Sequence, residues 1–302
     1  MWKKTRSAYD FVTEVLEAWN DDNCFRLSAA LSYYTLFSIA PLVVVVIATA
    51  GYFLGEQAIS GAIFNKVYTI IGDQAASGLQ TLVRNAYVSK PTSLSGFVSV
   101  AVLLFSATVV MTALQSSLNT ILNVRIRADK GILYFVISRL LALVMLLVIG
   151  VLLVATIVLN AVWIAISDYM GKFLPDSSYY VIEAGQLVIS LGMTTLLFAL
   201  MYKYLPDAKI RWRNIWIGSL TTSILLLVGR YLISFYLGNT NITSLYGAAG
   251  SVILLIVWIN YSSWIFFLGA EVIHVVSNRK GDRIIPSRIA ESYREVVEMQ
   301  DS

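Results

Sequence analysis

The sequence predicts an all-α fold, a polytopic membrane bundle of six transmembrane helices with both termini in the cytoplasm. Of its 302 residues, 58% are hydrophobic and only 13% are charged, and the mean hydropathy is +0.73. A water-soluble globule of this size needs more polar surface than that composition supplies. The charged residues cluster between apolar runs that are long enough to cross a bilayer. Lys and Arg also divide unevenly between the two sides that these runs define.

Residues 1–26 are predicted to be a cytoplasmic amphipathic segment. An apolar stripe at helical spacing faces away from three acidic side chains, a pattern typical of a helix that lies along the membrane surface or against the bundle. The lone cysteine, Cys24, cannot form an internal disulfide and is expected to be a small packing residue. The stripe consists of Phe11, Val12, Val15, Leu16 and Trp19.

The first span, Leu27–Leu54, is longer than a bilayer needs. Its 28 residues would reach roughly 42 Å as a straight helix, so it must tilt, kink or project. Pro41 removes a backbone donor and predicts a kink there. The hydroxyls of Ser28, Ser32 and Thr35 share a face of the first part. They are expected to bond their own backbone or a neighbouring helix, or to line a path.

Residues 55–93 are predicted to form an external helical hairpin between spans one and two. Two amphipathic patterns are separated near Gly72 and end before Pro91. The hairpin would serve either as a lid over the bundle or as a packed connection.

The remaining spans complete a transmembrane domain over residues 27–277, followed by a cytoplasmic tail at 278–302 whose apolar spacing predicts a short surface helix. With both ends inside, the inner segments hold 16 Lys and Arg and the outer segments hold 4. This bias fixes the orientation and explains the net charge of +4 without nucleic acid. Spans two to six are predicted at Leu94–Asn123, Ile132–Ile166, Val181–Tyr202, Asn214–Gly238 and Tyr246–Ser277.

The sequence does not indicate an enzyme. It contains no phosphate-binding GxxxxGK[ST] loop, no GxSxG nucleophile motif and no HExxH zinc motif. Its one histidine and one cysteine lie far apart in the sequence, which argues against metal chemistry. No catalytic residue, metal or cofactor is therefore expected.

Arg230 in span five is the charge nearest the middle of any span. It lies roughly 6 Å from the centre of the span, toward the outside, and an unpaired arginine there would cost at least about 2.5 kcal/mol. Glu183 lies in the same outer half of span four. Either the two side chains form an ion pair that locks spans four and five, or Arg230 faces a polar cavity and attracts an anionic substrate.

The last span carries polar residues at two depths. Asn260 and Ser263 lie near its middle, where intramembrane polar groups need partners or line a binding site. Glu271 and His274 share a face at its inner end. They would relay protons for coupled transport, or would simply be hydrogen-bonded and solvated near the interface.

Two motifs resemble those of the YihY/BrkB family of bacterial inner-membrane proteins. They are LSAALSYYTLFSIAP in span one and YGAAGSV with WINYSS and LGAE in span six. The resemblance covers nearly the whole chain and implies a cytoplasmic-membrane protein linked to serum resistance, envelope lipids or export. It supplies no agreed active site. The motif positions that it marks are Pro41, Gly247, Gly250, Gly269 and Glu271.

The function expected from these observations is transport. The chain is expected to export an amphipathic or anionic small molecule or lipid through a polar cleft between spans one, five and six. The alternative is an envelope scaffold or assembly protein that transports nothing. Members of the family were formerly labelled as a ribonuclease, and that activity conflicts with the absence of catalytic motifs from the sequence. The expected partners are the lipid bilayer and the substrate, with a homo-oligomer as a further option.

Overall fold

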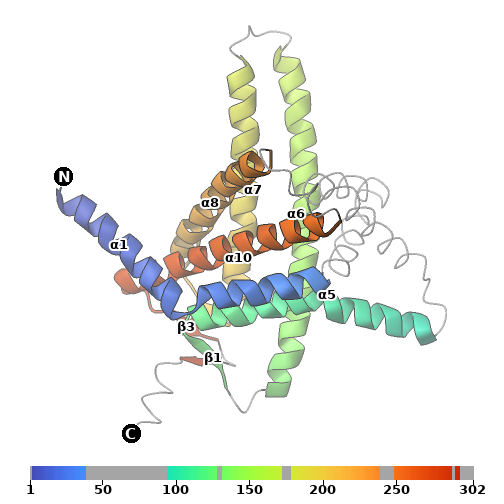
Figure 1. Ribbon diagram of the computed structural model, residues 1–302, viewed down its shortest axis with the longest axis vertical. Helices are drawn as coiled ribbons and strands as arrows, with labels where there is room; N and C mark the ends of the chain where they lie inside the picture. Colours follow the sequence, from blue (N-terminus) through green and yellow to red (C-terminus); the bar gives the residue numbers. More distant parts are fainter. Residues whose placement is uncertain are drawn as a thin grey trace.

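The fold is almost entirely helical (Figure 1). The computed structural model describes residues 2–38, 94–127, 131–171, 178–238, 248–287 and 290–292. The external hairpin predicted at 55–93, the second half of span one with its Pro41, and Gly247 lie outside the described residues.

The N-terminal segment forms a helix, a sharp turn and a second helix. Helix α1 runs from Trp2 to Asp21, and the chain is helical again from residue 24 through residue 38. Between them Asn23 has a φ of 53°, in the left-handed region that asparagine tolerates better than most residues. The predicted amphipathic segment is therefore helical, but it ends in a turn.

Five long helices follow in the described part of the chain, and their ends lie within a few residues of predicted spans two to six. Among the described residues, Tyr134–Ser167, Glu183–Tyr204 and Leu255–Arg279 are long and apolar enough to cross a membrane. The helices are α5 (Leu94–Ile121), α6 (Gly131–Gly171), α7 (Ser178–Tyr204), α8 (Trp212–Gly238) and α10 (Ala248–Arg279).

Helices α6 and α7 form an upright pair, while α5, α10 and the 24–38 helix run across them (Figure 1). Helix α8 packs against both α7 and α10, and α5 packs against α6 and α10. Helix α1 packs against α10. Helix α10, the last span of the sequence, therefore lies at the centre of the described contacts.

Short strands join three segments that are distant in sequence. Strand β1 (Val124–Ile126) pairs antiparallel with β4 (Ala290–Ser292), and β2 (Ala208–Lys209) pairs with β3 (Ile285–Pro286). The prediction of a surface helix in the tail is wrong for its described part, because these residues complete their backbone hydrogen bonds across two-stranded sheets. The tail thus fastens the segments after α5 and α7.

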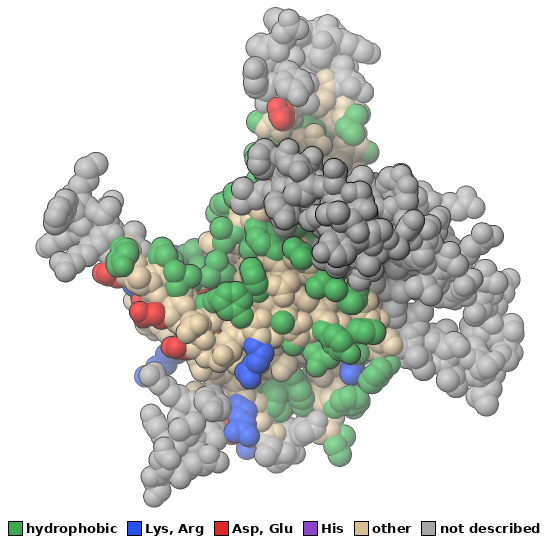
Figure 2. Space-filling model, viewed as in Figure 1, with side chains coloured by type: hydrophobic (Ala, Val, Ile, Leu, Met, Phe, Trp, Pro, Cys, Tyr) green, Lys and Arg blue, Asp and Glu red, His purple; other side chains and the backbone are tan. Residues whose placement is uncertain are grey.

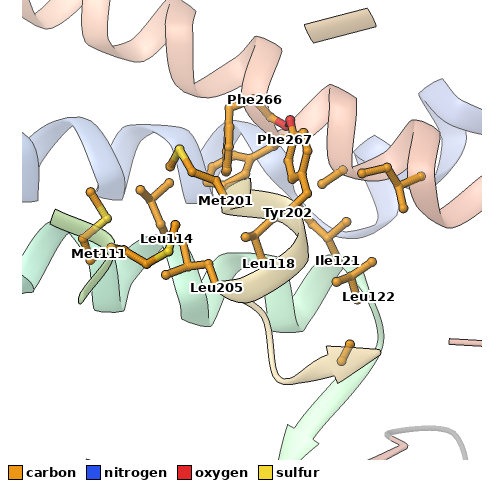
Figure 3. Packing of buried hydrophobic residues seen from close by; sticks show 14 of the residues in the cluster. Met111, Leu114, Leu118, Ile121, Leu122, Met201, Tyr202, Leu205, Phe266 and Phe267 are labelled. Atoms are coloured by element: carbon orange, nitrogen blue, oxygen red, sulfur yellow. The ribbon is translucent and has the colours of Figure 1, made fainter. Parts of the chain in front are cut away.

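The main apolar core lies where α5, α7 and α10 meet (Figure 3). Methionine, leucine and isoleucine side chains from α5 pack against Tyr202 of α7 and Phe267 of α10. The Tyr202 hydroxyl donates to the carbonyl of Phe266 at 2.6 Å and lies 2.8 Å from the Thr222 hydroxyl. This core therefore includes a buried polar link between α7, α8 and α10.

Apolar side chains also cover much of the outer surface. Ile132 is 86% exposed, and exposed Val, Ile and Leu side chains continue along α6. Figure 2 shows apolar side chains spread across one face, with acidic side chains along α1. An apolar exterior of this extent suits a lipid environment.

Candidate functional site

The turn after α1 directs Asp22 and Cys24 toward the C-terminal end of α10. Backbone hydrogen bonds from Asp22 to Ala18 and from Leu27 to Asn23 close the turn at 3.0 and 3.2 Å. Phe25 then fits edge-on between two tryptophans, with its ring centroid 4.2 Å from Trp19 and 5.1 Å from Trp264. The turn is thereby fixed against α10.

Glu271 is fully buried opposite this turn, with 0% of its surface exposed. The Cys24 thiol donates to its Oε1 across 3.6 Å. Burial raises the pKa of Cys24, so the thiol keeps its proton and remains a donor. The other oxygen, Oε2, has no hydrogen-bond partner in the described part of the chain. A buried carboxylate with one weak donor requires further compensation.

His274 and Asp22 complete the group, which we call the Glu271 cluster (Asp22, Cys24, Glu271 and His274). His274 Nδ1 lies 3.8 Å from Glu271 Oε2. Ligand atoms of Asp22, Glu271 and His274 all lie within 4.8 Å of one another. Burial, reinforced by the Glu271 carboxylate, raises the pKa of Asp22 to about 7. The fold thus concentrates two carboxyl groups, an imidazole and a thiol at one point.

Helix α1 holds the turn in place through its own contacts with α10. Val15 packs among Val272, Val275 and Val276. Glu14 accepts a hydrogen bond from Arg279 Nε at 2.6 Å. The other half of the predicted stripe points away, since Val12 and Leu16 are both more than 50% exposed. Helix α1 therefore lies against the bundle and still presents apolar side chains outward.

A second buried acid, Asp207, follows α7. Its Oδ2 accepts hydrogen bonds from Gln115 at 3.0 Å and from Asn119 at 2.8 Å, and its backbone N–H donates to Asn119 Oδ1 at 2.8 Å. Burial raises its pKa, although these two side-chain hydrogen bonds act in the opposite direction. Because its contacts are well satisfied, Asp207 is best explained as a structural link between α5 and the segment after α7.

Three hydroxyls proposed from the sequence bond to their own helices. Ser32 donates to the Ser28 carbonyl at 2.8 Å, Thr35 donates to the Leu31 carbonyl at 2.8 Å, and Ser263 donates to the Ile259 carbonyl at 2.7 Å. This is the ordinary way for a hydroxyl to be satisfied within an apolar helix.

Arg230 and Glu183 are both exposed, and the described residues contain no ion pair between them. Asn260 is half-buried in α10. The structure therefore brings Glu271 and His274 together, but it does not gather Arg230, Glu183 and Asn260 with them.

Two of the glycines marked by the sequence motifs lie in α10. Gly250 lies in its first turn. At Gly269 an added Cβ would lie 1.8 Å from Thr222 Oγ1 and 2.5 Å from the Tyr202 hydroxyl. Only a residue without a side chain fits this crossing of α8 and α10 without rearrangement.

Sequence analysis missed the participation of Asp22 and Cys24. The run Asp21-Asp22-Asn23 is typical of a turn, and a turn there would have separated Cys24 from α1 and exposed it to a partner helix. No local sequence pattern shows that Cys24 contacts Glu271, which lies 247 positions away.

The comparisons with known proteins agree on a membrane family. The sequence model of the family described as Virulence factor BrkB matches residues 15–292. The chain is 27% identical over 280 residues to a UPF0761 membrane protein of Verminephrobacter eiseniae, covering 90% of this chain and 61% of that protein. It is 26% identical to a UPF0761 membrane protein of Psychromonas ingrahamii, covering 89% of this chain and 88% of the relative.

Several relatives are longer than the present chain. The chain spans about three fifths of the Verminephrobacter protein and 59% of a UPF0761 membrane protein of Teredinibacter turnerae, to which it is 26% identical. No solved structure matches the chain.

Proposed function

The chain belongs to the Virulence factor BrkB family of membrane proteins, and from that premise we propose that it exports an anionic amphiphile of the lipid class across the bacterial inner membrane. Both termini lie in the cytoplasm in this proposal. The positive-inside bias of 16 against 4 supports the orientation. The pairing of the tail with the segments after α5 and α7 also supports it, because all three segments then lie on one side.

The observation that carries the proposal is the exposed guanidinium of Arg230. At ~1.5 Å per residue, Arg230 lies roughly 12 Å from the C-terminal end of α8. In this proposal α8 crosses the bilayer, and that depth then falls within the apolar part of a bilayer about 30 Å thick. A fixed cation exposed at this depth, without Glu183 as its partner, is suited to an anionic headgroup that enters from the lipid or from a polar path.

The chemistry of arginine limits the class of substrate. A guanidinium binds carboxylates and phosphates through two parallel hydrogen bonds. A hydrogen bond to a charged group contributes about 1.5–3 kcal/mol, which corresponds to a preference of roughly 10- to 100-fold. The exposed side chain of Tyr231, next to Arg230, suits the apolar part of an amphiphile.

Cysteine accessibility tests the proposed path. In a Cys24→Ser background, Arg230→Cys should react with a membrane-impermeant maleimide applied from outside, whereas Val228→Cys should not. Val228 is the matched control because it is exposed in the same turn but points to a different side. An unreactive Cys at position 230 would remove the path from the proposal.

A non-transporting scaffold is the second candidate, and a separate observation favours it. Ser32, Thr35 and Ser263 are satisfied within their own helices, as expected for a packed bundle without a polar channel. The two functions differ in their response to Arg230→Ala in a complemented deletion strain. The exporter loses export of the anionic lipid, whereas the scaffold retains wild-type lipid composition.

A further inference from the structure

We infer that Asp22, Glu271 and His274 form a binding site for one divalent first-row metal ion, with Zn²⁺ as the best match, which fastens the turn after α1 to the last membrane helix. The inference is independent of the transport proposal, because Arg230 lies in the outer half of a different helix. Metal chemistry was not expected because the one histidine and the one cysteine lie far apart in the sequence, and the fold removes that reason by bringing Asp22 and Cys24 to Glu271 and His274.

The positions of the ligand atoms fit such a site. Glu271 and His274 occupy positions i and i+3 of α10, a Glu-x-x-His spacing that presents both groups on one face and is used by metal sites in helical bundles. Asp22 approaches from the turn, and the three ligand atoms lie within 4.8 Å of one another. Tetrahedral ligands at about 2.1 Å from zinc lie about 3.4 Å apart. The 3.8 Å between Glu271 Oε2 and His274 Nδ1 needs only a small contraction.

The hydrogen bonding of Glu271 leaves the correct oxygen available. Cys24 donates to Oε1, which orients the carboxylate as an outer-shell partner would. Oε2 is fully buried and has no hydrogen-bond partner in the described residues, and neither does Nδ1 of His274. These two atoms, Glu271 Oε2 and His274 Nδ1, lie 3.8 Å apart and next to Asp22.

Charge balance also favours a divalent cation. When both acids are deprotonated, as metal binding requires, they carry two negative charges, and no Lys or Arg among the described residues forms an ion pair with either acid. Burying like charges together is costly unless a cation compensates them. One divalent ion makes the group neutral. Two oxygens and one imidazole nitrogen are ligands that zinc accepts, and three protein ligands leave a fourth position open.

Metal content and affinity test the site directly. The full-length chain is purified in detergent with a tag that contains no histidine, stripped with EDTA, loaded with ZnCl₂ and desalted. We expect stoichiometric zinc by mass spectrometry of the eluate. Because His274 is the sole histidine of the chain, its imidazole resonances report zinc binding without overlap. Hydrogen exchange in α1 should be slower with zinc than with EDTA, since the ion holds the turn.

Substitutions distinguish a built site from surface binding. Asp22→Asn and His274→Gln should each weaken zinc binding more than the ~10–100-fold that loss of an outer-shell partner costs. Both residues are only partly buried, so these variants are expected to fold where Glu271→Gln does not. Glu14→Gln is the matched control, because it removes an acid of α1 that pairs with Arg279 and lies outside the cluster. Wild-type chain without stoichiometric zinc, or wild-type affinity in either cluster variant, would overturn the inference.

Discussion

At the scale of single residues, Gly269 shows how closely α8 and α10 pack. A Cβ at this position would overlap the Thr222 hydroxyl and approach the Tyr202 hydroxyl, two groups that already share a hydrogen bond. Gly269→Ala should therefore lower the free energy of unfolding by about 1–3 kcal/mol, the usual cost of overpacking. Thermal unfolding in detergent measures the change.

Gly192→Ala is the control for this substitution. Gly192 also lies within a helix, but an added Cβ there meets nothing within 4 Å. Alanine should stabilise that position by about 0.5–1 kcal/mol because it reduces the freedom of the unfolded chain. Equal effects at positions 192 and 269 would refute the close crossing.

The raised pKa of Asp207 predicts how the stability of the protein depends on pH. Its pKa in the folded chain is raised above the ordinary value of 3.8, so the folded state holds this proton more tightly than the unfolded state. The stability that Asp207 contributes is complete below pH 3.8 and is lost as the pH rises through the raised pKa. Relative to Asp207→Asn, the wild-type unfolding temperature should therefore decrease as the pH increases from 4 upward. Parallel pH profiles for the two proteins would contradict the shift.

At the scale of elements, the tail strands fix which segments lie together. Arg125 of β1 is directly opposite Glu291 of β4. Opposed residues in an antiparallel pair have Cα atoms about 4.5–5.5 Å apart, which is within the range of a disulfide. Arg125→Cys with Glu291→Cys, in a Cys24→Ser background, should cross-link on mild oxidation. Arg125→Cys with Lys209→Cys, in unpaired strands, should not, and a reversed result would refute the register.

The helices and the strands differ in how far sequence could predict them. Helices α5, α6, α7, α8 and α10 follow from long apolar runs separated by polar segments, because each satisfies its backbone locally. The strands have two or three residues each, and their partners lie some 80 to 170 positions away, so no local pattern marks them. Part of the Glu271 cluster was not predicted for the same reason. The sequence shows that Glu271 and His274 share one helix face, whereas a distant turn brings Asp22 and Cys24 to them.

At the scale of the whole molecule, the structure combines an apolar exterior, a tail whose strands pair with the segments after α5 and α7, and two separate groups of polar side chains. The Glu271 cluster lies near the C-terminal end of α10, beside α1. Arg230 lies toward the opposite end of α8. In the two proposals, this separation places the anchoring of α1 at one end of the bundle and contact with an anionic substrate at the other.

Transbilayer movement of lipid in vesicles tests the proposed export most directly. The purified chain is reconstituted with a fluorescent lipid that carries a net negative phosphate headgroup, and with a neutral phosphocholine lipid for comparison. We predict that the anionic lipid moves faster than in protein-free vesicles. Arg230→Ala should lower this rate at least ~10-fold, and Arg230→Lys should retain a substantial part of it. Arg283→Ala should leave the rate unchanged, because Arg283 is an exposed arginine outside the spans. Wild-type vesicles no faster than protein-free vesicles, or an unaltered rate in Arg230→Ala, would contradict the account.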